Sequence, residues 1–381
     1  MGNSEKIRPI IKEDYKSVVR FLAKSTNGLF SEDFWLGRFE YWWDNNPAMD
    51  KDICRGWGLF DGRGDVYGFI GNIPIKYYIK GQVKTVCSAT SWYVEDGYKQ
   101  RSLEIFMPFF RQNAPLLLDT TPTEKVANIL LRLGFRNLEH AWLKKDAIYP
   151  ITLNEFWDFF VRRSSSNIIL SFILKTAGIF LISLIKVYQE IKKLKLHATD
   201  QYNFREIKKF DDSYSSLWNE VKEKYDIVAV RDQIALNWFF FGSKDLLSSR
   251  RVIEIRNDKT LIGYAAVKIV NHSQTGKGYN YFEVVDMVIN SDDYCAYVAV
   301  LRGLLKIAQN SEEKITLVKI NPFDKKIEGC LKKYGFFMRP GTAKFLYKVS
   351  GKNTGRMDIN EDSIQTGFYA TPLDGDRCFF P

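Results

Sequence analysis

The spacing of apolar residues along positions 1–150 predicts mixed layers of helices and strands. Some stretches repeat apolar residues at helical spacing, whereas others are continuous or alternating apolar runs bounded by Gly and Asp, as strands are. The predicted helices cover 12–24, 102–112 and a segment ending at Gly134, and the predicted strands cover 57–60, 66–79, 85–94, 116–118 and 136–148. This order is that of an α/β fold with α+β mixed layers, and not that of an alternating doubly wound fold.

The helix that ends at Gly134 has a recognisable start. Thr121 is predicted as its N-cap, Pro122 suits the first helical position, and Glu124 completes a capping box. Gly134 suits the left-handed conformation at the C-terminal end. Both ends of this helix are therefore predicted from local sequence.

Sequence features of the first domain return in the second half of the chain. Tyr67-Gly68-Phe69 is matched by Ile262-Gly263-Tyr264, and Leu133-Gly134-Phe135 by Tyr334-Gly335-Phe336. A chain of 381 residues is also too long for one ordinary hydrophobic core. We therefore predict two tandem domains, each a mixed, mostly antiparallel sheet flanked by helices, at 1–150 and 201–350, with an apolar helical linker at 151–200 and a C-terminal tail at 351–381.

The linker contains an almost wholly apolar stretch at 168–185. It is long enough to suggest a transmembrane span, but Lys175 lies in its middle, where a charge is costly. Lys175 and Gly178 begin a polar stripe that continues beyond the stretch, so we favour a helix that packs on a domain or on the partner in a homodimer. A helix on a membrane surface is the alternative, because basic residues flank the stretch at 162, 163, 192, 193 and 195.

Composition narrows the partners and the compartment. The net charge of +10 favours polyanionic partners, but the lysines are spread along the chain and no nucleic-acid-binding motif is visible, so we expect no nucleic acid. Five scattered cysteines without a CxxC pair argue against a disulfide framework and against a metal site. The N-terminus has no apolar segment typical of a secretory signal. We expect a cytoplasmic protein, with the inner membrane face as the alternative if 168–185 contacts lipid.

A candidate anion site lies where a strand is followed by a charged loop and a helix. Lys99, Gln100 and Arg101 precede a helix that is predicted to begin at Ser102. A helix N-terminus offers backbone N–H groups and the positive end of the helix dipole, and two cations stand beside it. This combination suits a pyrophosphate, although a solvated basic turn would show the same residues.

The whole arrangement resembles the GNAT superfamily of acyl-CoA-dependent N-acyltransferases, over about residues 5–150 and more weakly over about 203–350. In that family a loop of the form (Gln/Arg)-x-x-Gly-x-(Gly/Ala) holds the CoA pyrophosphate with its backbone amides. The counterpart here runs from Lys99 to Glu104, and Ser102 and Glu104 replace the two glycines. Leu-Gly-Phe ending at Phe135 matches the second motif of the family. The resemblance implies acyl-CoA as co-substrate and no permanently bound cofactor.

The resemblance also implies where acyl transfer would occur. The acyl-pantetheine would lie along the edge of the strand Ala89–Val94, which includes Trp92, and the backbone N–H near Tyr93 would polarise the thioester carbonyl. The acceptor amine must be neutral to attack, so a general base is needed. Asp119, after the short strand, and His140, in a following strand, are both candidates, and the sequence does not choose between them.

The acceptor side is suggested by two further segments. The element around Trp42 and Asn46 and the acidic tail around Asp374 and Asp376 resemble segments of GNAT proteins from surface-polysaccharide gene sets. Trp42 also fits a core residue, and the other three also fit turns. The resemblance implies the amine of a nucleotide-linked amino sugar as acceptor, specifically a dTDP-3-amino-3,6-dideoxyhexose for surface glycans.

The second copy differs from the first at the anion site. Asp292 and Asp293 stand where the first copy has Lys99 and Arg101, and an acidic loop repels pyrophosphate. We therefore predict that the 201–350 domain is degenerate and binds no CoA at this place. Two rival functions are a peptidyl transferase that uses aminoacyl-tRNA and a non-catalytic scaffold of two decayed domains.

Overall fold

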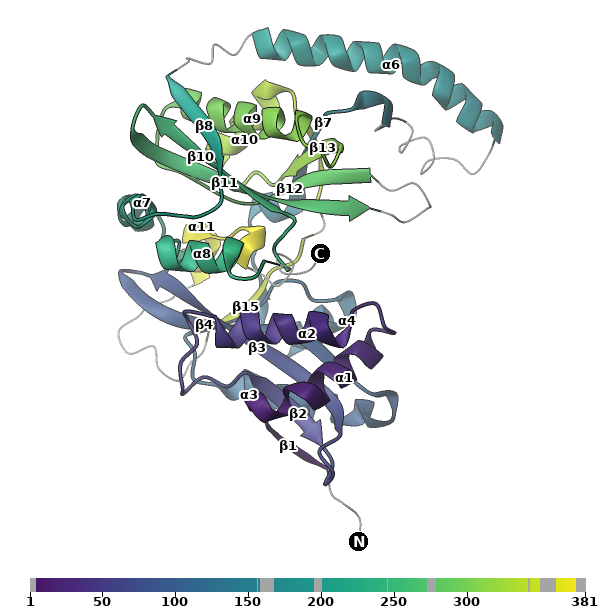
Figure 1. The fold of residues 1–381 in the computed structure, drawn as a ribbon, viewed down its shortest axis with the longest axis vertical. Helices are drawn as coiled ribbons and strands as arrows, with labels where there is room; N and C mark the ends of the chain where they lie inside the picture. The colour runs from purple at the N-terminus through teal and green to yellow at the C-terminus, as the bar shows by residue number, and fades with distance from the viewer. Residues whose placement is uncertain are drawn as a thin grey trace. The chain divides into compact units, whose positions relative to one another are not determined.

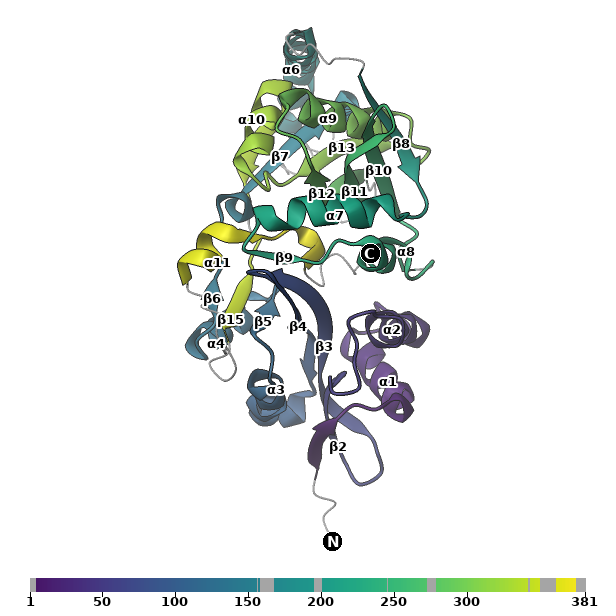
Figure 2. The same cartoon turned by 90° about the vertical axis from the view of Figure 1, so that its left-hand side faces the viewer.

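The computed structural model describes residues 5–155, 157, 168–194, 201–244, 246–272, 279–341, 343–349 and 361–374. The chain divides into two compact units. Unit 1 contains 1–139, 221–248 and 344–380, and unit 2 contains 140–220 and 249–343. Each unit has a mixed, mostly antiparallel sheet with flanking helices, as predicted (Figures 1 and 2).

The sheet of unit 1 runs in the order β1-β2-β3-β4-β5-β15-β6, while β9 pairs with β3 and β16 pairs with β9. Its strands are β1 (Lys6–Pro9), β2 (Gly56–Phe60), β3 (Val66–Ile79), β4 (Gln82–Val94), β5 (Leu116–Asp119), β6 (Arg136–Asn137), β9 (Ile227–Ala229), β15 (Leu346–Val349) and β16 (Phe368–Tyr369). The long hairpin β3–β4 is its centre. Lys80 and Gly81 form the two-residue turn of this hairpin, both with positive φ, at 44° and 86°. This backbone geometry matches the right-handed twist of the two strands.

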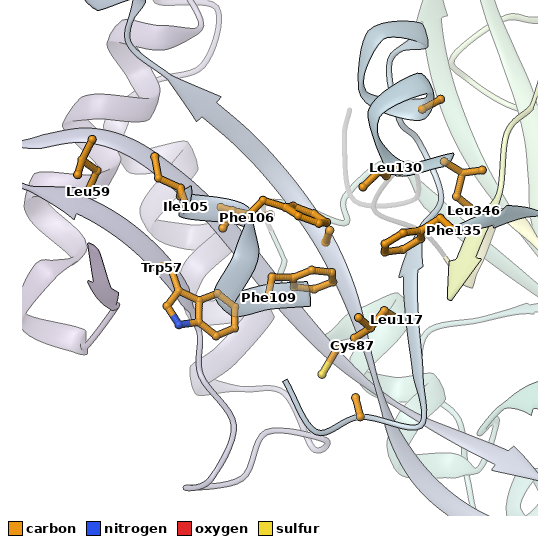
Figure 3. Packing of buried hydrophobic residues seen from close by; sticks show 14 residues of the cluster. Trp57, Leu59, Cys87, Ile105, Phe106, Phe109, Leu117, Leu130, Phe135 and Leu346 are labelled. Carbon is orange, nitrogen blue, oxygen red and sulfur yellow. The ribbon is translucent and has the colours of Figure 1, made fainter. Parts of the chain in front are cut away.

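The helices of unit 1 lie against this sheet and bury its apolar side chains. They are α1 (Tyr15–Ser25), α2 (Glu32–Phe39), α3 (Ser102–Arg111), α4 (Glu124–Arg132), α8 (Gln233–Phe241) and α11 (Glu361–Gly367). Phe106 and Phe109 of α3 pack among buried side chains of the sheet, with Trp57 and Cys87 in the same cluster (Figure 3). The packing of α3 is therefore fixed by aromatic burial next to β4, the strand of the predicted site.

The start of α4 corrects one prediction. Thr123, and not Thr121, is the N-cap, because its side chain accepts a hydrogen bond from the N–H of Val126. Pro122 disfavours a helical conformation at the residue before it, so the helix begins after the proline. The predicted end holds, since Gly134 has a φ of 84°.

The sheet of unit 2 runs in the order β14-β7-β13-β12-β11-β10-β8. Its strands are β7 (Lys145–Pro150), β8 (Tyr202–Ile207), β10 (Arg250–Asn257), β11 (Thr260–His272), β12 (Tyr279–Ile289), β13 (Ile315–Ile320) and β14 (Phe337–Pro340). Its helices are α6 (Ile168–Leu194), α7 (Ser213–Val221), α9 (Tyr294–Gln309) and α10 (Lys325–Tyr334). As in unit 1, a long antiparallel hairpin, here β11–β12, is followed by a helix and a parallel strand.

Short strands are exchanged between the two halves of the sequence. The strand β7 was expected to close the first sheet, but it pairs with β13 and β14 of unit 2. Conversely β9 and β15, from the second half of the chain, pair with β3 and β5 in unit 1. A short apolar strand can pair with the edge of either sheet, and the local pattern of apolar residues does not predict which sheet it joins.

The predicted linker helix is present as α6, which spans Ile168–Leu194. The helix packs on the rest of unit 2. Gln189 donates to the carbonyl of Pro150 at 3.3 Å, and the ring of Tyr188 lies 5.9 Å from that of Phe337. In the part of the chain whose side chains the structure describes, no helix combines the length and apolarity that a membrane span requires.

Candidate functional site

Strand β4 contains a β-bulge at Ser91. Two residues of β4, Ser91 and Trp92, lie opposite Ile70 of β3, because the register shifts there, and Ser91 has a φ of 51°. Before the bulge Cys87 and Ala89 belong to the core cluster beside α3, and after it Trp92 and Val94 pack against that cluster. The extra residue therefore reverses which side chains face α3.

Beyond the bulge, β4 has a strand partner on one side only. The parallel pairing of β4 with β5 consists of Cys87 with Leu117 and Ser88 with Leu118. The last residue of β5, Asp119, pairs with β15 on its other side. Within the described chain, the edge 89–94 of β4 therefore faces away from β3 without a neighbouring strand. We call this segment the open edge.

The hydrogen bonds next to the open edge fix which amides it presents. The N–H of Glu95 donates to the carbonyl of Tyr67 in β3 at 2.9 Å. Amide directions alternate along an antiparallel strand, so the N–H of Tyr93 also points to β3 and that of Val94 points to the open edge. The predicted role of the Tyr93 N–H does not fit this alternation, whereas the N–H of Val94 has the required direction.

Three polar side-chain atoms that the described part of the chain leaves without partners occur at the separation of β4 from β5 and farther along β4, with Ser88 and Trp92 on opposite faces of the sheet. Ser88 Oγ, Thr120 Oγ1 and Trp92 Nε1 are shielded from solvent and have no hydrogen-bond partner within the described residues. The indole of Trp92 stacks on Phe106 at 4.7 Å, which fixes its plane. Buried polar atoms are normally paired, so these three atoms are exceptions to the usual pattern.

The thiols close to the separation are not suited to nucleophilic catalysis. Burial raises the pKa of Cys87 to about 12, and burial also raises the pKa of Cys54. A thiol with a raised pKa holds little thiolate at neutral pH. Acyl transfer through a cysteine intermediate at this place is therefore disfavoured.

The predicted pyrophosphate loop is more closed than the sequence suggested. Residues Asp96–Arg101 form a 3-10 helix that runs directly into α3, and the N–H of Ser102 donates to the carbonyl of Lys99. Lys99 pairs with Asp96 at 2.5 Å, and Arg101 with Glu104 at 3.0 Å. The replaced glycines explain the difference, because this chain continues in helical turns where the family's glycines allow an open loop. No side-chain hydrogen bond caps the N-terminus of α3.

The two candidate bases are placed differently from each other. Asp119 ends β5 in unit 1, opposite Leu346 of β15, and is 9% exposed. His140 belongs to unit 2 and lies between β6 and a short 3-10 helix, not in a strand as expected. Its carbonyl accepts from the N–H of Leu143, so the chain turns there instead of extending. Asp119 is the base candidate that unit 1 holds next to the strand separation.

Trp42 and Asn46 have structural contacts. Trp42 is fully buried, with the guanidinium of Arg38 4.5 Å from its ring centre. The side chain of Asn46 donates to the carbonyls of Trp42 at 2.8 Å and Pro74 at 2.9 Å, and accepts from the N–H of Ala48. Trp42 thus has the core role that its sequence also allowed, and Asn46 fixes a turn to β3.

Asn46 also lines a cavity of about 170 Å³ inside unit 1. Two charged side chains, Lys76 of β3 and Asp232 before α8, contribute to its wall, and Trp238 of α8 supplies an aromatic surface. The remaining lining residues are Pro47, Ala48, Ile75, Val230, Ile234, Ala235 and Phe239. We call this the α8 cavity. Its wall residues from α8 and from the segment just before it, Val230 and Asp232, were missed by sequence reasoning, which assigned them to the second domain.

Asp374 is buried and holds the C-terminal segment in unit 1. Its carboxylate accepts from Tyr77 at 3.2 Å and from the backbone N–H of Thr371 at 2.6 Å, and it pairs with Arg231 at 3.4 Å. Asp374 is 0% exposed, so it contacts no substrate unless this segment moves. Asp376 lies outside the described residues.

The corresponding places in unit 2 are filled by the protein's own side chains. β12 pairs with β13 up to Glu283, and there Lys319 contacts Glu283 at 3.0 Å and Asp146 at 3.6 Å. At the N-terminus of α9, Asp293 accepts from the N–H of Cys295 at 2.8 Å, and Asp292 pairs with Lys326. The hydrogen bond from Cys295 lowers the pKa of Asp293, so its carboxylate stays charged.

No protein-family model and no curated protein sequence matches the chain. Solved structures do resemble it. N-myristoyltransferase from Saccharomyces cerevisiae with bound myristoyl-CoA aligns with a TM-score of 0.53 and 12% identity, over 91% of this chain and 82% of that chain. A protein from Enterococcus faecalis described as a probable N-acyltransferase has a TM-score of 0.55 and 9% identity, over 91% and 72%.

A GCN5-related N-acetyltransferase from Anabaena variabilis has a TM-score of 0.53 and 10% identity, over 91% of this chain and 73% of that chain. At such low identity the likeness shows the fold and nothing finer. The two units are therefore tandem GNAT-like domains, as the sequence predicted.

Proposed function

We propose that this protein is an acyl-CoA-dependent N-acyltransferase whose reaction takes place in unit 1. The observation that carries the proposal is the separation of β4 from β5 after Ser88, which leaves the open edge of β4 beside the N-terminus of α3. An extended acyl-pantetheine would add to this edge like a further strand, with hydrogen bonds to outward amides. The fold shared with structures of N-acyltransferases supports the same conclusion.

The chemistry assigns a role to each part of the open edge. The N–H of Val94 would donate to the thioester oxygen, where negative charge develops as the amine nitrogen attacks the carbonyl carbon. Asp119 is our first choice for the base that takes the proton of the amine, and His140 is the second. The CoA thiolate then leaves and is protonated. Ser102 and the N-terminus of α3, with Lys99, Gln100 and Arg101 beside it, would face the CoA phosphates.

We further propose that the acceptor is the amine of a nucleotide-linked amino sugar, with dTDP-3-amino-3,6-dideoxyhexose as first choice. The α8 cavity supports an amine-bearing, anionic acceptor because Asp232 and Lys76 offer opposite charges to an ammonium and a phosphate. Ligand pockets usually exceed roughly 300 Å³, so the cavity would hold only a part of such a substrate. The cavity lies near the open edge. Ile75 in its wall pairs with Val86 of β4, and Val86 is two residues, or about 7 Å, from Ser88, where the pairing of β4 with β5 ends.

Thermal denaturation with acetyl-CoA, dTDP and tRNA tests the proposal. Stabilisation by acetyl-CoA and by dTDP supports a sugar N-acyltransferase, and stabilisation by tRNA supports a peptidyl transferase instead. A thiol-release assay with an amino sugar nucleotide then measures turnover. The α8 cavity is tested separately with Asp232→Asn, which should raise the KM for the amine and leave the KM for acyl-CoA unchanged.

A non-catalytic scaffold is the second candidate, and one observation favours it. The cations of the predicted pyrophosphate segment are paired with acids, Lys99 with Asp96 and Arg101 with Glu104. If none of the three ligands stabilises the protein and no acyl-CoA is consumed, the scaffold is the better description.

A further inference from the structure

An unusual apolar surface lies on the outer side of α6. Phe180, Leu184, Val187 and Ile191 are 68%, 48%, 55% and 47% exposed. Their spacing of four, three and four residues keeps them within an arc of about 60° on a helix of 3.6 residues per turn. We call these four residues the apolar stripe. Surface apolar residues that occur singly are common, but a continuous row over three turns marks an interaction surface.

The apolar stripe is exposed although α6 itself is docked. Gly178 and Gln189, the two buried residues of the described part of α6, lie on the side opposite the stripe. A side chain at Gly178 would meet the ring of Trp157, so the helix approaches that residue closely. The inner side of α6 also carries Ile182 and Ile185, which are half-buried, so α6 has apolar residues on both its inner and its outer side, whereas an ordinary surface helix has a polar outer side.

Basic residues outnumber acidic ones on the helices next to the apolar stripe. α6 contacts α10, and Lys192 of α6 lies 3.4 Å from the position that a side chain at Gly335 would take. In sequence, α6 and α10 carry eight lysines and two glutamates. All four lysines of α10 are exposed, at 325, 326, 332 and 333. Phe337 of β14, 40% exposed, extends the apolar surface next to Tyr188.

We propose that α6 docks unit 2 on an anionic lipid surface, with the apolar stripe inserted among the acyl chains and the lysines of α6 and α10 at the headgroups. An aliphatic face bordered by lysines is the pattern of helices that lie in the plane of a membrane. Anionic lipids complement the lysines, and each cation near the headgroups strengthens the attachment. A second copy of the chain would instead bring like charges together around the stripe, which disfavours it as the occupant.

Sedimentation of the full-length protein with lipid vesicles tests the proposal. We expect binding to vesicles of phosphatidylcholine with phosphatidylglycerol, weaker binding to phosphatidylcholine alone, and release by salt. The double variant Leu184→Glu with Val187→Glu should lower the partition coefficient on anionic vesicles by at least about tenfold, because two buried aliphatic groups are lost. Lys332→Glu with Lys333→Glu should weaken binding to anionic vesicles only.

The matched control is Leu29→Glu with Val83→Glu, which places the same charges on two exposed apolar positions of unit 1, at 76% and 55% exposure. It should bind vesicles as the unmodified protein does. Unchanged thermal denaturation of all variants excludes misfolding as the cause. The proposal is overturned if anionic vesicles bind no protein. It is likewise overturned if Leu184→Glu with Val187→Glu affects binding no more than the control Leu29→Glu with Val83→Glu. It is also overturned if Leu184→Glu with Val187→Glu turns a vesicle-free dimer into a monomer, which would identify a second copy as the occupant.

Discussion

In each unit the second strand of the long hairpin separates from its parallel neighbour before it ends, and different side chains lie at the two points of separation. In unit 2, where β12 leaves β13, Lys319 joins the buried carboxylates Glu283 and Asp146. In unit 1, where β4 leaves β5, Ser88 and Thr120 bury hydroxyl oxygens without partners among the described residues. Buried charges and hydroxyls both need partners, and Lys319 is the partner that unit 2 supplies to the two carboxylates. This difference supports our proposal that the ligand binds at the strand separation of unit 1.

The helices that follow these strands differ in the same sense. Asp293 occupies the N-terminus of α9 by accepting from the N–H of Cys295. No side chain takes that place at the N-terminus of α3. An anion at a helix N-terminus is stabilised by N–H groups and by the dipole. Asp293 already supplies that anion at α9, whereas α3 continues a 3-10 helix and its first N–H, that of Ser102, donates to Lys99.

The largest expected effect comes from removing the cation at the strand separation of unit 2. Lys319→Met removes the cation between Glu283 and Asp146, whose exposed fractions are 4% and 8%. Removing one member of a buried ion pair leaves the charge of the other less compensated, and we expect a loss of about 3 kcal/mol in the free energy of unfolding. This is the low end of the usual range, because Asp146 keeps Asn321 and Arg339. Urea denaturation measures the change.

Ser88→Ala is the matched change in unit 1. It removes a buried hydroxyl that has no partner within the described residues, so the free energy of unfolding should stay the same or rise by less than about 1 kcal/mol. If Ser88→Ala destabilises as much as Lys319→Met, the two points of separation are equally filled and the comparison fails.

The next effect concerns the open edge itself. Val94→Pro removes the N–H that points away from β3, and proline is tolerated on strand edges. If this N–H polarises the thioester, kcat should fall about 100-fold, as for the loss of one oxyanion donor. Ile289→Pro is the control in unit 2. The N–H of Asn290 donates to the carbonyl of Ile262 in β11 at 2.7 Å, so the N–H of Ile289 points away from β11, as that of Val94 points away from β3. It should leave kcat unchanged, and equal losses in both variants would point to a general folding defect.

The elements of the fold were predictable from sequence, but their distribution between units was not. Helix α3 begins at Ser102 as expected, because apolar spacing is a local signal. The exchange of β7 for β15 depends on pairing between distant segments, and short apolar strands carry no mark of their partner. Matched sequence features thus identified two domains and could not show that each domain borrows strands from the other half.

The candidate site was predictable at the level of a strand and not of single residues. Ser91 has a positive φ without being glycine, so the bulge that turns Trp92 and Val94 towards α3 leaves no sequence signal. Asp374 was expected on the acceptor side because its segment resembles the closing segment of other GNAT proteins, with a solvated turn as the alternative. Its partner Arg231 lies 143 positions away, and only the folded chain brings the two together.

A smaller effect on the KM for acyl-CoA should distinguish the basic residues before α3 from the acidic residues before α9. Lys99→Ala with Arg101→Ala should raise the KM for acyl-CoA by about tenfold at low ionic strength, and less at high salt, because exposed charges are screened. The effect stays modest because Asp96 and Glu104 already neutralise these cations. Asp292→Ala should leave this KM unchanged. The opposite ranking, measured by initial rates, would move the CoA site to unit 2.

The smallest effect concerns the cap on α9. Asp293→Ala should lower the free energy of unfolding by about 1 kcal/mol at neutral pH, as expected for a lost N-cap. The pKa of Asp293 is lowered by the hydrogen bond from Cys295, so the contribution of its carboxylate is complete above the unfolded pKa of about 3.9 and is lost as the pH falls through the lower folded value. The difference in Tm between the protein and the variant should therefore shrink on acidification from pH ~7 to pH ~3. A difference that grows instead would mean that Asp293 is held as a neutral acid, and α9 would then lack the fixed anion that distinguishes it from α3.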